Sequence, residues 1–231
     1  MPECTDCPLT LAQLTGKDES HLVVDATGLR LFPECAQALI RLQECASVEG
    51  FDLRVASGYR SFSRQRDIWN AKACGDRPVH DDMGCEITIE ELGEIERLWA
   101  ILRYSALPGA SRHHWGTDID VYDAAAVSAD YRVKLEPVEV NPGGVFEAMH
   151  NWLDAQIAAG DSFGFFRPYA DDRGGVAPER WHLSYAPISQ SCAKVITPGK
   201  ILDSLLDYDL ALAETVSAQI QTIYTRFIHL S

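Results

Sequence analysis

The chain has 231 residues and a formal net charge of −14, from 34 acidic and 20 basic side chains. Hydrophobic residues make up 46% of the chain and charged residues 23%, which is ordinary for a soluble globular protein. No apolar run approaches the roughly 20 residues that a membrane-spanning helix needs, so no membrane segment is expected. An acidic surface without a Lys/Arg cluster repels phosphate backbones, which makes nucleic acid an unsuitable partner. An anionic substrate would need a locally placed cation.

The first third of the chain predicts helices around one short strand. The expected elements are a weak helix over 8–20, a helix over 33–48, a strand over 51–56 and a helix over 63–74. Pro33 suits the first turn of the second of these helices, and apolar residues recur at helical spacing along it. Ser63 is the expected N-cap of the helix that follows the strand.

The rest of the chain alternates loops, helices and short strands. The expected elements are a polar loop over 75–84, a helix over 88–104, a strand over 117–122, a loop over 141–144, a helix over 145–159, a loop over 171–178, a strand over 181–185 and a long helical tail from 198. Thr88 and Glu91 match a capping box at the start of one helix. The apolar stripe of the tail follows a 3.6-residue period, which predicts packing on the core and does not require a coiled coil.

Short strands with flanking helices, without regular βαβ alternation, indicate an α+β fold. We expect a small antiparallel sheet flanked by helices, with a helical C-terminal tail. The predicted organisation is a single domain: a helical segment over 1–49 packed on the core, the core over 50–197 and a helical extension over 198–231.

Seven cysteines, an odd number, exclude a complete set of disulfides within the chain. Cys4 and Cys7 form a Cys-x-x-Cys motif without a convincing second pair, so we interpret them as ordinary thiols rather than half of a zinc site or a redox pair. Cys74 and Cys85 would be the first disulfide to form in an oxidising compartment. The N-terminus lacks a basic stretch followed by an apolar run, which predicts a cytoplasmic protein, or a periplasmic one if a leader has been removed.

Two short motifs carry candidate metal ligands: Ser111-x-His113-x-x-Gly116-x-x-x-Asp120 and Glu179-Arg180-Trp181-His182. Two histidines and one carboxylate from separate elements suit a catalytic zinc ion, which needs three protein ligands and one open position for water. Asp120 lies in a predicted strand, where only Asp118 shares its face. Glu179 stands close before His182 as a candidate general base.

Together these motifs resemble the VanY-type zinc D-Ala-D-Ala carboxypeptidases, which belong with the lysostaphin-like and hedgehog-like metallopeptidases. A third segment strengthens the resemblance: Ser57-Gly58-Tyr59-Arg60-Ser61, followed by Gln65. The resemblance spans roughly residues 50–187. It implies that His113, Asp120 and His182 hold one Zn²⁺ ion per chain on the small sheet, with Glu179 as the catalytic base.

The resemblance also implies how a substrate is held. Arg60 would grip the terminal carboxylate of a peptidoglycan-derived peptide, a role that suits its planar guanidinium, with Gln65 and Ser111 as hydrogen-bond partners. The family commonly has Ala where this chain has Asp118, which could orient a ligand histidine, perturb the metal or compete as a ligand. His114 is expected either to support a residue of the site or to pack beside it. Trp181 is expected to pack against the wall of the site without taking part in the chemistry.

The expected activity is release of a terminal D-Ala, with D,D- and L,D-specificity both open and no oligomeric state predicted. One alternative is a zinc endopeptidase or amidase of the same fold acting on cell-wall peptides. Arg60 disfavours it, because an endopeptidase has no free carboxylate to bind. The other alternative is a non-catalytic zinc-binding module, which Glu179 disfavours.

Overall fold

The computed structural model describes residues 7–229, so Cys4 of the Cys-x-x-Cys motif lies outside the described residues. The described helices are α1 (Leu11–Leu14), α2 (Pro33–Val48), α3 (Phe62–Ala73), α4 (Glu94–Tyr104), α5 (Pro137–Val140), α6 (Glu147–Ala159), α7 (Ala186–Val195), α8 (Pro198–Leu205) and α9 (Ala213–Ile223). The strands are β1 (Val23–Val24), β2 (Arg30–Leu31), β3 (Leu53–Ser57), β4 (Asp118–Asp123), β5 (Phe165–Phe166) and β6 (His182–Tyr185). The structure confirms the predicted α+β class.

Four short strands form an antiparallel sheet in the order β3-β4-β6-β5, and β1 pairs with β2 in a separate ribbon. The register places Asp120 of β4 opposite His182 of β6 on one side and opposite Ser57 of β3 on the other. Residues that are directly opposite across an antiparallel pair project from the same face. The sheet therefore brings two predicted ligands together although 62 positions separate them in sequence.

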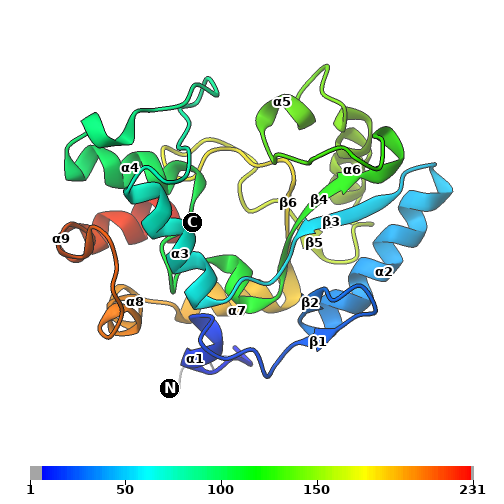
Figure 1. Ribbon diagram of the computed structural model, residues 1–231. Coiled ribbons are helices and arrows are strands. Elements are labelled where there is room, and N and C mark those ends of the chain that lie inside the picture. Colours follow the sequence, from blue (N-terminus) through cyan, green and yellow to red (C-terminus); the bar gives the residue numbers. More distant parts are fainter. Residues whose placement is uncertain (1–6, 230–231) are drawn as a thin grey trace.

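The elements divide into two halves (Figure 1). One half holds the four-stranded sheet with α2 and α6, and the other holds α3, α4, α8 and α9, with α7 running beneath both. Each half has its own buried hydrophobic cluster. The sheet half buries Leu39, Leu42, Ile119, Val121, Leu153 and Leu183, and the helical half buries Trp69, Leu98, Leu102, Ile201, Ile220 and Ile223. Helices α8 and α9 of the C-terminal tail thus contribute Ile201, Ile220 and Ile223 to the hydrophobic cluster of the helical half.

Two helix starts differ from the sequence prediction. Ser61, not Ser63, caps α3, because the Ser61 hydroxyl accepts from the backbone N–H of Arg64 at 3.2 Å. The predicted helix over 88–104 is split: a 3₁₀ turn covers Ile89–Glu91, and α4 begins only at Glu94. The Thr88 side chain makes no capping bond.

The tail and two connecting segments also differ from expectation. In place of one long tail helix there are α8, α9 and a π-helical turn over Tyr224–Ile228. Leu206, which fits the apolar stripe, lies at the break and is 77% exposed. Sequence reasoning also missed α5 and α7, both of which begin with Pro in the first turn.

None of the described cysteines forms a disulfide; Cys74 and Cys85 are exposed free thiols. Among the described helices, none has the length and apolar character needed to cross a membrane.

Candidate metal centre

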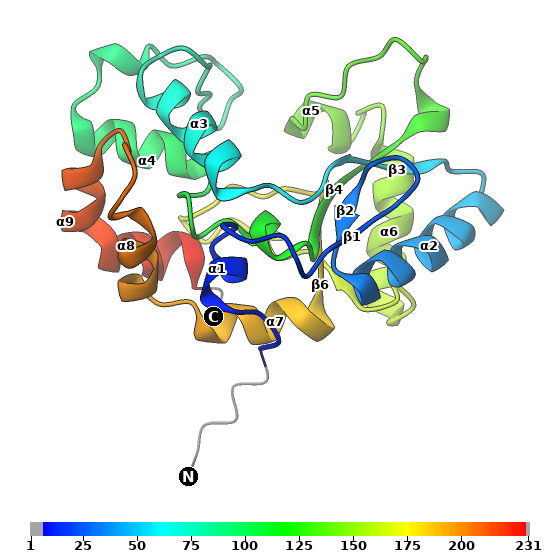
Figure 2. The same ribbon diagram turned by 60° about the horizontal axis from the view of Figure 1, so that its bottom comes forward.

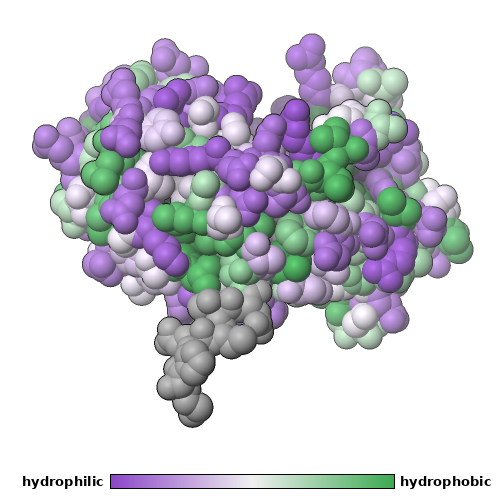
Figure 3. Space-filling view, turned by 90° about the horizontal axis from the view of Figure 1, so that it is seen from below, coloured by the Kyte–Doolittle hydropathy of each residue, from purple (hydrophilic) through white to green (hydrophobic). Residues whose placement is uncertain are grey.

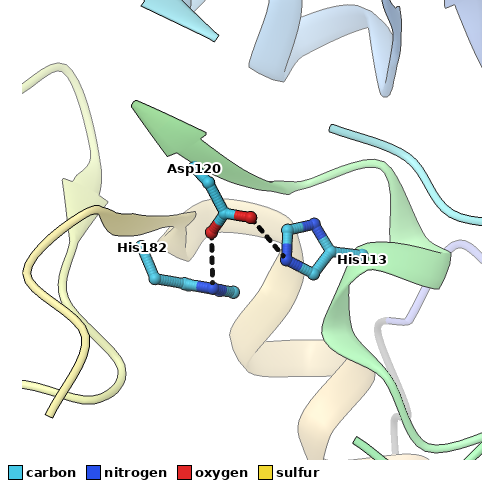
Figure 4. A group of neighbouring side chains, drawn as sticks. All are labelled: His113, Asp120 and His182. Carbon is cyan, nitrogen blue, oxygen red and sulfur yellow. Dashed lines mark ion pairs between the residues drawn. The ribbon is translucent and has the colours of Figure 1, made fainter. Parts of the chain in front are cut away.

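Three elements place the predicted ligands around one point (Figure 4). Asp120 and His182 project side by side from β4 and β6, and His113 comes from a 3₁₀ turn over Arg112–Trp115. Gly116 ends this turn in the left-handed region, at φ 71°. A Cβ there would lie 3.0 Å from the backbone nitrogen of Phe32, so both the left-handed backbone and this close approach favour glycine.

The ligand atoms face one another at distances suited to a shared cation. His113 Nε2 lies 3.4 Å from Asp120 Oδ2, and His182 Nδ1 lies 3.2 Å from Asp120 Oδ1. The three ligand atoms lie within 4.8 Å of one another, and their side chains are almost completely buried. Among the described residues, Asp120 Oδ1 has no hydrogen-bond donor. Because buried carboxylate oxygens are rarely left without a partner, this set fits a metal ion bound between the three side chains.

Each ligand histidine is oriented through the ring nitrogen that points away from the centre. His113 Nδ1–H donates to the carbonyl of Gly58 at 2.9 Å, and His182 Nε2–H donates to Asp118 Oδ1 at 2.9 Å. Such partners fix the tautomer and the ring orientation of metal-binding histidines. Burial lowers the pKa of His113 to about 4, so this ring is neutral and ready to bind.

His182 is electrostatically different from His113. Burial disfavours its charged form, but the hydrogen bond to Asp118 and the adjacent carboxylate of Asp120 outweigh burial and raise its pKa to about 10. The ring is therefore protonated in the metal-free protein. A metal ion that binds Nδ1 must displace that proton, which couples metal binding to proton release.

Asp118, the departure from the family pattern, lies in a buried hydrogen-bond network. It accepts from Arg112 Nε at 2.7 Å and from the Thr117 hydroxyl at 2.7 Å, besides His182. Burial opposes ionisation, yet Arg112 and His182 hold the pKa of this carboxyl below its usual range. Arg112 also donates to the Ser184 hydroxyl at 2.6 Å. Sequence reasoning missed Arg112, which keeps Asp118 ionised and directed at His182 instead of at the centre.

We expect Asp118→Ala to weaken zinc affinity about 10–100-fold without abolishing binding, because the ring of His182 loses its orienting partner. The free energy of unfolding should also fall by about 3–5 kcal/mol, since Arg112 is left buried without its counter-ion. Competition with a chelator measures the first effect and denaturant unfolding the second.

The control is Asp154→Asn, which removes a carboxylate paired with Arg167 and Arg180 and should leave zinc affinity unchanged. Unchanged affinity in Asp118→Ala would refute the orienting role. Complete loss of zinc from Asp118→Ala, with retention in Asp120→Ala, would make Asp118 the ligand.

Glu179 lies at the edge of the centre. Its Oε2 is 3.5 Å from His182 Nδ1, the ring nitrogen that also faces Asp120. Burial raises the pKa of Glu179 to about 7, in the range where a carboxylate exchanges protons efficiently at neutral pH. Its position one short turn before His182 is fixed by a backbone bond from His182 N–H to the Glu179 carbonyl at 3.1 Å.

Arg60 is held beside the centre by neutral partners. Its guanidinium donates to Gln65 Oε1 at 2.8 Å and to the Ser57 hydroxyl at 3.1 Å. Gln65 is itself fixed, because its amide donates to the carbonyl of Ala106 at 2.6 Å. Gln65 therefore positions Arg60 in this structure. The hydroxyl of buried Ser111 has no partner among the described residues.

Backbone bonds join the Arg60 turn to the turn that carries His113. Arg60 N–H donates to the His113 carbonyl at 3.1 Å, and His114 Nδ1–H donates to the Arg60 carbonyl at 2.6 Å. His114 Nε2 accepts from Gly109 N–H at 3.1 Å, which fixes its tautomer. Burial lowers the pKa of His114 to about 3, so it stays neutral. His114 thus holds the backbone of Arg60 in place.

Two further side chains near the site were not predicted. Lys72 lies two turns after Gln65 on α3, so the helical period could have placed both on one face. Burial, with the nearby charge of Arg77, lowers the pKa of Lys72 to about 8, and its ammonium donates to the Ser105 hydroxyl at 2.7 Å. The ring of Tyr169 contacts that of His182 edge-on, with 5.1 Å between the ring centroids.

Trp181, which was expected to pack against the wall of the site, packs with Val140 and Phe146 in a separate small hydrophobic cluster.

The site combines a buried His-Asp-His set on a small antiparallel sheet with a carboxylate beside it. This arrangement is typical of metal-dependent hydrolases. The family model described as VanY, D-alanyl-D-alanine carboxypeptidase, matches residues 28–188. Because this match covers more than half of the chain, the chain belongs to the VanY family. The predicted resemblance is confirmed.

The chain is also similar to individual proteins and solved structures. An uncharacterized protein of Haemophilus influenzae is 42% identical over 103 residues, which cover 43% of this chain and 70% of the relative. The solved structure of VanYB in complex with D-alanine-D-alanine matches with a TM-score of 0.52 at 22% identity, covering 86% of this chain and 88% of the other. A vancomycin-resistance D,D-pentapeptidase VanY variant in complex with Zn(II) matches with a TM-score of 0.50 at 21% identity, covering 84% and 88%. At these identities the two structures show a shared fold.

Proposed function

We propose that this protein is a zinc-dependent carboxypeptidase that removes a terminal D-amino acid, D-Ala in the first instance, from peptidoglycan-type peptides. Arg60 is the observation that carries the proposal. Within residues 7–229 its guanidinium forms no ion pair, although the chain has an excess of acidic residues. A largely buried cation with neutral partners beside a metal centre suits an incoming carboxylate.

The residues of the site divide the work of peptide-bond hydrolysis. A zinc ion held by His113, Asp120 and His182 would polarise the scissile carbonyl and make an adjacent water more acidic. Glu179 takes a proton from the attacking water and returns it to the departing amine. Arg60 and the Ser111 hydroxyl hold the terminal carboxylate, so that the bond next to the last residue lies over the centre. The products are a shortened peptide and one free amino acid.

Both alternatives from the sequence fit these observations less well. An endopeptidase or amidase would leave Arg60 without an anionic partner in the complex. A non-catalytic zinc module would have no use for a buried Glu179 whose pKa is raised to about 7. The family description and the ligand of the related VanYB structure favour D-Ala-D-Ala termini. We include L,D-termini in the proposal because the role proposed for Arg60 concerns only the terminal carboxylate.

Arg60→Ala should lower kcat/KM for a peptide with a free C-terminus about 10–100-fold, because a charge-assisted hydrogen bond to the carboxylate is lost. Arg60→Lys should restore little, since Lys offers a point charge and not a planar pair of donors. Amidation of the peptide C-terminus should produce a similar loss in the wild type and little further loss in Arg60→Ala. Steady-state kinetics of the four combinations measure this non-additivity.

The control for this cycle is Arg41→Ala, which removes an exposed guanidinium of α2 that lies over the ring of Phe163. It should leave the preference for the free carboxylate intact. Equal cleavage of free and amidated peptides by the wild type would contradict the carboxypeptidase and favour the endopeptidase.

A further inference from the structure

The N-terminal segment, residues 7–16, braces the two turns that form the site. It runs beneath the junction of the two halves, beside α7 (Figure 2). The indole N–H of Trp115 donates to the Leu14 carbonyl at 3.1 Å, and the Phe62 N–H donates to the Gly16 carbonyl at 2.8 Å. The Tyr59 hydroxyl also donates to Gly16, at 3.3 Å. The segment thus contacts both the Arg60 turn and the His113 turn. Seen from below, hydrophobic side chains reach the surface along the middle of the molecule (Figure 3).

Two thiols meet where this segment begins. Cys7 Sγ lies 3.5 Å from Cys192 Sγ of α7, although 185 positions separate them. Cys192 is completely buried, whereas Cys7 is half-buried and lies in a stretch without regular secondary structure. A disulfide brings its sulfur atoms to about 2.05 Å, so the pair is roughly 1.5 Å from bonding distance. An irregular segment can make that adjustment without disturbing a helix.

We propose that Cys7 and Cys192 form a reversible disulfide that fastens the N-terminal segment to α7, with a small-molecule disulfide as the oxidant. This inference is independent of the proposed peptidase activity. It gives the Cys7 half of the Cys-x-x-Cys motif a partner that lies far away in the sequence and next to it in the fold.

The exposure of the two thiols sets the order of the steps. The Cys7 thiol loses its proton and attacks the small-molecule disulfide, because burial shields Cys192 and raises the pKa of its thiol. One thiol is released, and a mixed disulfide remains on Cys7. Cys192 then loses its proton and attacks the Cys7 sulfur, which releases the second thiol. Two protein thiols are oxidised, and one small disulfide is reduced to two thiols.

The bond would close a long loop, because 185 positions separate the two cysteines. Cross-links that close long loops restrict the unfolded chain most, within the chain-entropy model of disulfide stabilisation. The melting temperature of the oxidised protein should therefore rise by roughly 5–15 °C over the reduced protein.

The experiment treats the full chain with oxidised glutathione, alkylates the remaining thiols and digests the product with trypsin. We expect a disulfide-linked pair of the peptides 1–17 and 181–194, with Cys192 as the single cysteine of the second peptide. Its mass should be lower by two hydrogen atoms than the sum of peptide 181–194 and peptide 1–17 carrying one alkyl group on Cys4. Dithiothreitol should release both peptides and reverse the rise in melting temperature.

Variants separate this pair from the other thiols. Cys7→Ser and Cys192→Ser should both lose the linked peptides and the rise in melting temperature, and Cys7→Ser is informative even if the change at buried Cys192 harms folding. Cys45→Ser, at an exposed thiol, should keep both effects, as should Cys4→Ser. A bond between Cys4 and Cys7 with Cys192 alkylated, a glutathione adduct that persists on Cys7, or an unchanged melting temperature would overturn the proposal.

Discussion

Glu179→Gln should lower kcat/KM by about 10²–10⁴-fold while the protein keeps its zinc, because an amide cannot accept the proton of the attacking water. The substitution conserves the size and shape of the side chain and keeps one acceptor oxygen, so the largely buried position at the edge of the centre should tolerate it. The relevant geometry is the 3.5 Å between Glu179 Oε2 and His182 Nδ1, which places the carboxylate next to the centre. Paired measurements of peptide cleavage and bound zinc on one preparation test the prediction.

A charge-matched control is Glu96→Gln, because Glu96 accepts from the Gly93 N–H at the start of α4 and has no contact with the ligands. It should retain wild-type activity. If Glu179→Gln loses its zinc, Glu179 is a ligand and not the base. If it keeps both zinc and full activity, the proton is transferred by another group.

His113→Ala, Asp120→Ala and His182→Ala should each abolish tight zinc binding, and activity should fall to background. Each substitution leaves two protein ligands where a catalytic zinc site uses three. The other two side chains stay in place, because β4 and β6 hold Asp120 and His182 opposite each other while the 3₁₀ turn holds His113. Metal analysis of the folded, gel-filtered variants measures the loss.

His114→Asn is the matched control for these variants, since His114 adjoins His113 but directs both ring nitrogens to backbone groups. It should keep one zinc per chain and lose part of the preference for a free C-terminus, because His114 holds the Arg60 carbonyl. Retention of stoichiometric zinc by any of the three alanine variants would remove that residue from the ligand set.

The sequence predicted best where local signals and a family motif coincide. The bounds of α2 agree with the prediction because Pro33 marks its first turn and its apolar face repeats at helical spacing. His113, Asp120 and His182 were found because motif spacing is visible in the chain, and the structure brings all three together. Their roles in metal binding and catalysis stay predictions.

The features that the sequence did not predict depend on how side chains and helix starts are placed in the folded chain. Arg112 is buried against Asp118 of β4 and Ser184 of β6, and nothing in the sequence shows that these three side chains meet. The capping signal at Thr88 and Glu91 was misleading, since Gly93 and Glu96 three residues apart provide the start of α4 instead. The Cys7–Cys192 contact likewise joins two segments that are 185 positions apart.

The most direct test of the account is to incubate the zinc-loaded protein with D-Ala-terminated tetrapeptides and pentapeptides of peptidoglycan type and to identify the products by mass. We expect release of a single terminal D-Ala and no cleavage at internal bonds, with the Glu179→Gln protein inactive in parallel. Cleavage at an internal bond, or no cleavage of either peptide by folded protein with stoichiometric zinc, would contradict the proposed carboxypeptidase.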